Sequence, residues 1–170
     1  ILISQSGETA DTLAALREAK NRQVKTLAIV NVVGSSIARE ADNVFYTLAG
    51  PEISVATTKA YSAQLIAIYT LALQFAKERN EIEMPEYEKL IKELDTLPDK
   101  IQEVIDNQEE IQKFAAKQAA AKDVFFIGRG IDYAVSLEGS LKLKEISYIH
   151  SEAYAAGELK HGTISLIEDG

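Results

Sequence analysis

The chain has 170 residues, of which 46 % are hydrophobic, and it contains nine glycines and three prolines but no cysteine. This composition excludes disordered and fibrous proteins, and the length suits one ordinary domain or parts of two. The net charge of −8 argues against nucleic acid or an anionic membrane surface as the main partner, because both require basic patches.

The missing cysteine excludes disulfides, thiolate metal sites and a cysteine nucleophile within these residues. It is consistent with a cytoplasmic protein. The sequence contains no convincing cluster of metal ligands, and we expect no cofactor. The longest apolar run is far shorter than the roughly 20 residues of a membrane-spanning helix. The sequence begins without Met, directly in an apolar strand-like run, so we expect it to be an excerpt from a longer protein.

The first fifty residues alternate short apolar runs with segments of helical periodicity. We predict strands at residues 1–4, 25–33 and 43–48, a helix at 10–23, and a turn followed by a short helix at 34–41. The second strand is almost continuously apolar, as in strands buried inside a parallel sheet. Strands that alternate with helices in this way predict an α/β fold, in which a parallel sheet carries helices on both faces.

The following segments are predicted to be helical. Residues 55–79 are mostly apolar, and we expect a long helix that is buried on most sides. Residues 80–121 are highly charged, and we interpret them as a helical connector. In the helix expected after Pro98, apolar residues recur with a helical period, which predicts one stripe packed against a neighbour. The stripe consists of Ile101, Val104, Ile105, Ile111 and Phe114.

A second α/β unit is predicted to begin at residue 122. Residues 123–130 indicate a strand that ends in a loop bracketed by glycines, and residues 132–149 indicate a helix. Residues 164–167, ISLI, indicate the start of a further strand. The predicted parts are therefore an α/β unit at 1–79, the connector at 80–121 and a partial second unit at 122–170.

Three charged residues stand out on the helix predicted at 132–149. Glu138, Lys142 and Glu145 fall within a narrow arc, because each helical residue advances by about 100°. Leu141 and Ile146 lie on or beside the same arc, whereas an ordinary surface helix separates charged from apolar residues. Buried charges are rare unless they are paired, and they mark candidate functional sites. We favour that interpretation over an ion-pair ladder on a solvated face.

A second candidate site is the SQSGET loop at residues 4–9, which follows a predicted strand and opens a helix. The hydroxyls of Ser4, Ser6 and Thr9 and the backbone N–H groups are suited to a phosphate at the positive end of that helix. The alternative is that Ser6 or Thr9 only caps the helix. Hydroxyl-rich turns at 35–36 and 57–58 should reach the same sheet edge, which favours a polyol phosphate as the ligand.

His161 lies between Lys160 and Gly162 in a predicted loop, and it is a candidate acid or base catalyst because imidazole titrates near neutral pH. A single histidine is more often structural or exposed, and we interpret His150 in that way. The sequence contains neither GxxxxGKS/T nor GxGxxG, so nothing indicates a nucleoside triphosphate or a dinucleotide.

These motifs resemble the isomerase part of glutamine–fructose-6-phosphate aminotransferase, a family built from sugar isomerase (SIS) domains. The resemblance rests on ISQSGETADTL, NVVGSS, EISVATTKAY, GRG, ISLI and, most specifically, LKLKEISYIHSEAYAAGELKHG. It implies a three-layer αβα SIS-type fold with a partial parallel sheet. Residues 1–79 would be a first SIS subdomain without its first strand, and residues 122–170 would be the start of a second.

The resemblance also implies a cytoplasmic enzyme that converts fructose-6-phosphate to glucosamine-6-phosphate, with ammonia released from glutamine in a separate domain. That domain, and a lysine that forms an imine with the sugar, would lie outside these residues, so we do not expect the 170 residues alone to turn over substrate. A non-catalytic SIS module that senses a sugar phosphate and a plain sugar-phosphate isomerase are the alternatives.

The family's residue roles fall on nine positions of this sequence. The phosphate would be held by Ser4, Gln5, Ser6 and Thr9, and the sugar would be bordered by Val55 and Thr57. Glu145 would move the proton between C1 and C2, and Lys142 would assist it. In the family's homodimer, His161 would catalyse ring opening of the sugar bound by the neighbouring subunit. A carboxylate in an apolar site suits a base that removes and returns a proton near neutral pH.

Overall fold

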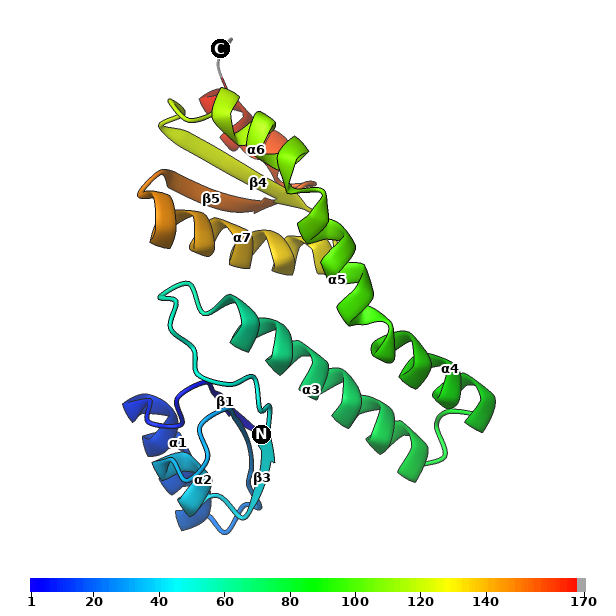
Figure 1. Ribbon diagram of the computed structural model, residues 1–170. Helices are drawn as coiled ribbons and strands as arrows, with labels where there is room; N and C mark the ends of the chain where they lie inside the picture. Colours follow the sequence, from blue (N-terminus) through cyan, green and yellow to red (C-terminus); the bar gives the residue numbers. More distant parts are fainter. Residues whose placement is uncertain (168–170) are drawn as a thin grey trace. The chain divides into compact units, whose positions relative to one another are not determined.

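Figure 1 shows the computed structural model of the chain, which describes residues 1–167. The chain divides into two compact units: unit 1 comprises residues 1–103, and unit 2 comprises the described residues from Val104 onward. The boundary lies inside helix α5 (Leu97–Asp106), within the segment predicted to be the connector.

The sheet of unit 1 contains three parallel strands in the order β1-β2-β3. The elements in chain order are β1 (Leu2–Ser4), α1 (Ala10–Asn21), β2 (Leu27–Val30), α2 (Ser36–Glu40) and β3 (Asn43–Tyr46). Ser4, Val30 and Tyr46 are in register, so the carboxyl ends of the three strands are level at one edge of the sheet. The predicted parallel sheet and its alternation with helices are confirmed, although the second strand is shorter than the predicted run.

The core of unit 1 follows from the alternation of side chains along β2, because successive residues of a strand point to opposite faces. Val30 is fully buried against Leu16 of α1 and Ile37 of α2. Ile29 points to the other face and is also fully buried. On that face, residues of β3 and of α3 (Thr58–Glu78) line a common cavity. Unit 1 therefore has three layers, with the sheet between α1 and α2 on one side and α3 on the other.

Helix α3 differs from its prediction in two ways. It begins three residues later than predicted, because Thr57 adopts a left-handed backbone conformation with φ of 57°. It is also not buried on most sides: its buried residues are Ala60 and Ala67, whereas Tyr69 is 44 % exposed. One side of the helix contacts the sheet and another contacts the next helix, and these two contacts leave part of its apolar surface open.

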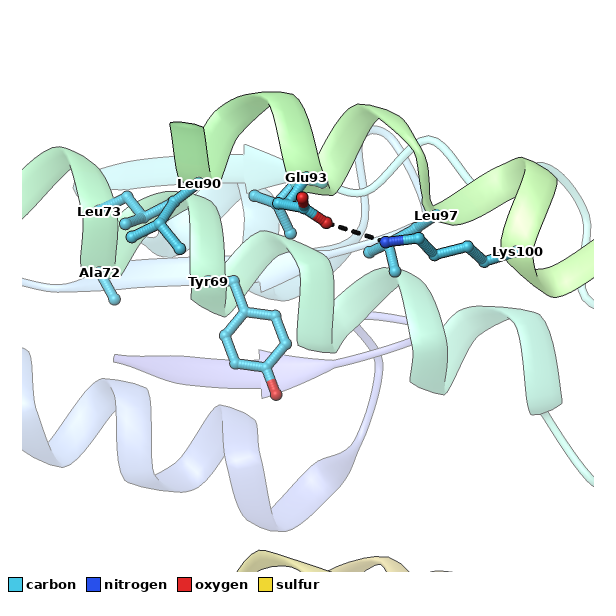
Figure 2. A pocket seen from close by; sticks show the side chains of 8 residues that line it. Tyr69, Ala72, Leu73, Leu90, Glu93, Leu97 and Lys100 are labelled. Atoms are coloured by element: carbon cyan, nitrogen blue, oxygen red, sulfur yellow. Dashed lines mark hydrogen bonds and ion pairs between the residues drawn. The ribbon is translucent and has the colours of Figure 1, made fainter. Parts of the chain in front are cut away.

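A cavity of about 420 Å³ opens between α3, α4 (Met84–Asp95) and α5. Figure 2 shows that Tyr69 of α3 and Leu90 of α4 line it, with an ion pair between Glu93 and Lys100 alongside, 2.9 Å long. The rest of the lining is apolar. None of the candidate site residues lines this cavity.

The predicted connector is helical, as expected, and it comprises three helices: α4, α5 and α6 (Gln108–Lys117). The apolar stripe predicted after Pro98 is only partly right, because each of its five residues is more than half exposed. A break at Asn107 separates α5 from α6, so the stripe does not form one continuous surface. The last two residues of the stripe, Ile111 and Phe114, line an apolar groove that also includes Phe126.

Unit 2 has a two-stranded parallel sheet, formed by β4 (Asp123–Gly128) and β5 (His150–Ala155), which α7 (Ile131–Ser147) connects. The helix α7 lies against both strands (Figure 1). The hydroxyl of Ser151 in β5 donates a hydrogen bond to the carbonyl of Ser140 in α7 at 2.7 Å, and both residues are buried. Ser140 therefore marks the face of α7 that is turned toward the sheet.

Two features of unit 2 differ from the sequence prediction. The strand β5 is not predicted, because HSEAYA contains no β-branched residue; its pairing with the apolar strand β4 overrides a weak local propensity. The strand predicted at 164–167 is wrong, because the segment forms a 3₁₀ turn, η2 (Thr163–Leu166). Gly162 precedes it with a φ of 133°, and the Ser165 N–H donates to the Gly162 carbonyl at 3.0 Å, so the chain turns instead of extending.

Helices long and apolar enough to cross a membrane are absent from residues 1–167.

Candidate functional site

The first group of candidate residues lies in unit 1, in the loop from Ser4 to Thr9 that joins β1 to α1. Ser4 is buried, and its hydroxyl accepts a hydrogen bond from the Gly7 N–H at 3.0 Å. Its Oγ also lies 2.8 Å from Oγ1 of Thr9. The Ser6 hydroxyl accepts a hydrogen bond from the Glu8 N–H at 3.2 Å. These bonds fold the loop back on itself just before the first turn of α1.

The amino end of α1 carries a hydroxyl that is not used as a cap. Thr9 is the N-cap residue, but its side chain makes no capping hydrogen bond within the described residues, and its Oγ1 faces Ser4 instead. The structure therefore does not support the interpretation that Thr9 only caps the helix. The first N–H groups of a helix have no partner inside it, and they lie at the positive end of its dipole, so this position suits an anion such as a phosphate.

The amino end of α2 contacts the same loop and supports it. Gly7 has a φ of 67° and lies so close to Ser35 that a Cβ at position 7 would be 2.0 Å from the Ser35 Oγ. The Ile37 N–H donates to the Gly7 carbonyl at 2.9 Å, and the Ser36 N–H donates to Oε1 of Glu8 at 2.7 Å. Hydrogen bonds from Ser36, first from its side chain and then from its backbone, lower the pKa of the Glu8 carboxyl. This supporting role of Glu8 is not predicted from the sequence.

Val55 and Thr57 lie in the long loop between β3 and α3. Val55 is 82 % exposed, and the Thr57 hydroxyl donates to the Val55 carbonyl at 3.0 Å. Asn31, directly after β2, holds the start of this loop: its Nδ2 donates to the Gly50 carbonyl at 2.7 Å, and its Oδ1 accepts from the Ala49 N–H at 2.8 Å. Asn31 is not among the predicted site residues, although a polar residue at the carboxyl end of a buried strand is a recognisable signal.

The three loops leave the same edge of the sheet, as the sequence predicts, because the strands are parallel and their carboxyl ends are in register. The structure brings Ser4, Ser6 and Thr9 together in one loop. No hydrogen bond among residues 1–103 joins this loop to Val55 or Thr57.

The second group lies in unit 2, on α7. The Lys142 Nζ is 2.7 Å from Oε2 of Glu145 and 3.5 Å from Oε1 of Glu138. The hydrogen bond with Glu145 is the main cause that raises the pKa of the Lys142 ammonium; burial acts in the opposite direction, and the charge of Glu138 raises the pKa further. Lys142 therefore remains positively charged at neutral pH, directly beside the carboxylate proposed to carry a proton.

The three charges lie on the face of α7 that is turned away from its own sheet. Ser140 faces the sheet, and a step of about 100° per residue puts all three charged side chains within about 40° of the opposite direction. Their side chains are only 20 to 29 % exposed, whereas Val135 and Ile146 on the same helix are 56 % and 65 % exposed. The predicted mixture of charged and apolar residues on one helix face is therefore present, and the charges are less exposed than the apolar residues.

The two histidines occupy different positions. His161 ends the short turn η1 (Leu159–His161) and is exposed; its N–H donates to the Glu158 carbonyl at 2.9 Å. No hydrogen bond or ion pair among residues 104–167 joins His161 to Glu145 or Lys142. His150 begins β5 and pairs with Asp123, with 2.8 Å between Nδ1 and Oδ1. In the described part of the chain, no group of three or more acidic or histidine side chains is arranged to hold a metal ion.

The parallel sheet and the hydroxyl-rich loop at its strand ends are typical of an α/β protein that binds its ligand at this edge of the sheet. Comparison with known families identifies which family it is. The model of the SIS domain matches residues 1–74 and 119–170, and the chain belongs to the SIS domain family.

Among curated proteins, the chain is similar to the glutamine–fructose-6-phosphate aminotransferases (isomerizing) of Caldanaerobacter subterraneus subsp. tengcongensis and Clostridium tetani. The identities are 64 % and 63 % over 170 residues, all of this chain, but only 28 % of the length of each relative. Among solved structures, the chain is similar to the C-terminal domain of glucosamine-fructose-6-phosphate aminotransferase from Francisella tularensis. The TM-score is 0.94 at 44 % identity, over 98 % of this chain and 47 % of that one.

Proposed function

We propose that this chain is the isomerase part of an enzyme that converts fructose-6-phosphate to glucosamine-6-phosphate with ammonia derived from glutamine. The chain would bind a hexose-6-phosphate and catalyse the interconversion of ketose and aldose. The pairing of Glu145 with Lys142 at 2.7 Å on α7 is the observation that carries this proposal. The similarity to the two aminotransferases along the whole chain supports it.

The phosphate is assigned to the SQSGET loop of unit 1. Ser4, Gln5, Ser6 and Thr9 hold it at the amino end of α1, where N–H groups and the helix dipole favour a negative charge. The lack of a side-chain cap from Thr9 supports this role. Val55 and Thr57 border the sugar.

The proton transfer is assigned to Glu145. Isomerisation removes a proton from the carbon beside the carbonyl; the C–H electron pair forms a C=C bond, and the carbonyl π pair moves onto oxygen to give an enediolate. A hydroxyl proton then passes from one of the two oxygens to the other, and the carbon-bound proton returns to the neighbouring carbon as the new carbonyl forms. One carboxylate that first accepts and then donates the proton is sufficient for the transfer between the two carbons. Lys142 lies beside it as a cation, and it stabilises the negative charge that develops on oxygen during the reaction.

Ring opening is assigned to His161, which we infer to act on the sugar bound by the neighbouring subunit of a homodimer. Opening the ring moves a proton between the anomeric hydroxyl and the ring oxygen, a different place on the sugar from the C1–C2 transfer. His161 is exposed, and no hydrogen bond or ion pair among residues 104–167 joins it to Glu145, which is consistent with action outside its own unit. We also infer that the protein is cytoplasmic.

The substitution Glu145→Gln tests the proposal, because it keeps the shape of the side chain and removes the base. In the full-length protein, fructose-6-phosphate should still bind, while exchange of the C1 or C2 proton with solvent should fall by about 10²–10⁴-fold. Exchange is measured by NMR in deuterated water, and binding by calorimetry.

If exchange is unchanged in the Glu145→Gln protein, the assignment of proton transfer to Glu145 is wrong. The three charges of α7 would then be interpreted as an ion-pair ladder. If the unmodified protein binds the sugar phosphate but never exchanges its proton, the chain is instead a sensing module.

A further inference from the structure

Glu138 has no part in the proposed function, although it belongs to the same cluster on α7. Its Oε1 lies 3.5 Å from the Lys142 Nζ. Glu138 is about one turn before Lys142 on the helix, and Glu145 is about one turn after it. The side chain of Glu138 is 24 % exposed and that of Lys142 is 20 % exposed. Carboxylates are rarely this little exposed unless they have a partner or a function, so the position of Glu138 requires an explanation.

The spacing of the two carboxylates determines where the ammonium can lie. Glu138 precedes Lys142 by four residues, the favourable order for a helical ion pair, and Glu145 follows it by three. A lysine side chain has a flexible four-carbon stem and a compact charge. With one partner the ammonium can rotate about that partner, whereas two partners, one from the preceding turn and one from the following turn, restrict its position.

We propose that Glu138 is a positioning residue, whose carboxylate holds the Lys142 ammonium in place beside Glu145. The catalytic consequence rests on the proposed function, in which Lys142 assists Glu145. The placement of the ammonium itself does not depend on that function, so the two claims are tested separately.

The charges around Lys142 agree with this role. Glu145 and then Glu138 both raise the pKa of the Lys142 ammonium. On the strands packed against α7, the charged side chains interact with one another: His150 pairs with Asp123 and lies 3.8 Å from Glu152. Loss of the Glu138 charge therefore lowers the pKa of Lys142 and increases the fraction of neutral amine at a given pH.

The first experiment measures, without substrate, how strongly Glu138 holds Lys142 in its charged form. Full-length wild-type and Glu138→Gln proteins are treated briefly with acetic anhydride at mildly alkaline pH, and the acetylation of individual lysines is measured by mass spectrometry. Only the neutral amine reacts, so Lys142 should be acetylated about twofold faster or more in the variant, as expected for the loss of one helical ion pair. Lys144 is exposed on the same helix and serves as the internal reference.

The matched control is Glu109→Gln, which removes the same charge from an exposed position on α6 in the same unit. It should leave the ratio of Lys142 to Lys144 acetylation unchanged. An unchanged ratio in the Glu138→Gln protein as well would overturn the placement of Lys142 by Glu138.

The second experiment measures the catalytic consequence. A misplaced ammonium should lower kcat for C1–C2 proton exchange by about 10- to 100-fold in the Glu138→Gln protein. The KM for fructose-6-phosphate should change by less than about threefold, since the phosphate is assigned to Ser4, Gln5, Ser6 and Thr9 and not to Glu138. Glu138→Asp keeps the charge and should recover part of both the acetylation ratio and kcat, which a merely structural defect would not explain.

The two experiments separate the possible failures. A faster acetylation of Lys142 with unchanged kcat would overturn the positioning role in catalysis and leave the proposed function intact. If the wild-type protein shows no exchange at all, the proposed function fails, and the acetylation ratio still decides whether Glu138 places Lys142.

Discussion

The hydroxyl of Ser4 has two neighbours in the loop that it begins. It accepts the Gly7 N–H at 3.0 Å and lies 2.8 Å from the Thr9 hydroxyl. A serine hydroxyl has one donor hydrogen and two acceptor lone pairs. Its donor is therefore available either to Thr9 or to a ligand, which makes Ser4 both a structural support of the loop and a candidate ligand of a phosphate.

Replacing Ser4 and Ser6 with Ala in the full-length protein tests the phosphate site. Each lost hydrogen bond to a charged phosphate should cost about 1.5–3 kcal/mol. The affinity for fructose-6-phosphate should therefore fall far more than the affinity for unphosphorylated fructose, as measured by calorimetry.

The control for this prediction is Ser62→Ala, because Ser62 is exposed on α3 and its hydroxyl donates only to the Thr58 carbonyl. That variant should bind both sugars like the wild type. Equal weakening of both sugars by the Ser4 and Ser6 substitutions would mean that the loop supports the fold without binding the phosphate.

At the scale of the elements, the positions of β2 and β3 depend on a contact at their amino ends, away from the candidate site. The Oδ2 of Asp42 accepts from the Thr26 N–H at 2.9 Å and from the Thr26 hydroxyl at 2.8 Å, and the Asp42 N–H donates back to that hydroxyl at 3.0 Å. The backbone bond from Thr26, followed by the side-chain bond, lowers the pKa of the Asp42 carboxyl. These bonds align the start of two adjacent strands.

The pKa shift of Asp42 predicts how this contact depends on pH. A carboxyl whose pKa is lower in the folded state contributes stability above its unfolded pKa, and this contribution is lost as the pH falls through the folded pKa. At neutral pH, amides of residues 26–30 should exchange with deuterium several-fold faster in Asp42→Asn than in wild type. The difference should shrink as the pH falls below the ordinary aspartate value of 3.8.

Hydrogen–deuterium exchange with mass spectrometry of the full-length proteins measures this effect, with each comparison made at one pH. Glu81→Gln, an exposed change between α3 and α4, is the control and should leave these amides unaffected. A difference that persists undiminished in acid would show that the carboxylate charge is not its source.

At the scale of the whole molecule, the inferred homodimer predicts that two defective subunits can repair each other. A two-fold dimer has an isologous contact, which creates two equivalent sites. If His161 acts on the sugar of its neighbour, a mixed dimer of His161→Ala and Glu145→Gln subunits contains one site with both functional groups. It should recover up to about half of the wild-type activity, because one of its two equivalent sites is intact.

Co-expression of the two full-length variants with different affinity tags isolates the mixed dimer, and its rate of glucosamine-6-phosphate formation is compared with that of each parent. Circular dichroism of the parents establishes that both are folded. If a folded mixed dimer shows no more activity than its parents, His161 acts within its own subunit or has no catalytic role.

The sequence by itself determined the features that depend on local patterns. The apolar run around Ile29 is a buried strand because its side chains suit both covered faces of a sheet, and the SQSGET loop lies between β1 and α1 as predicted. The cluster of Glu138, Lys142 and Glu145 also required only helical periodicity, because residues three and four apart on a helix are neighbours.

Tertiary structure decided the features that depend on residues far apart in the chain. HSEAYA becomes a strand only because β4 pairs with it, and ISLI has a strand-like composition but turns after Gly162. Glu8 and Asn31 acquire their roles from partners in other loops. Local propensity differs between conformations by only about 1 kcal/mol per residue, so pairing and burial against distant residues decide the outcome wherever the local preference is weak.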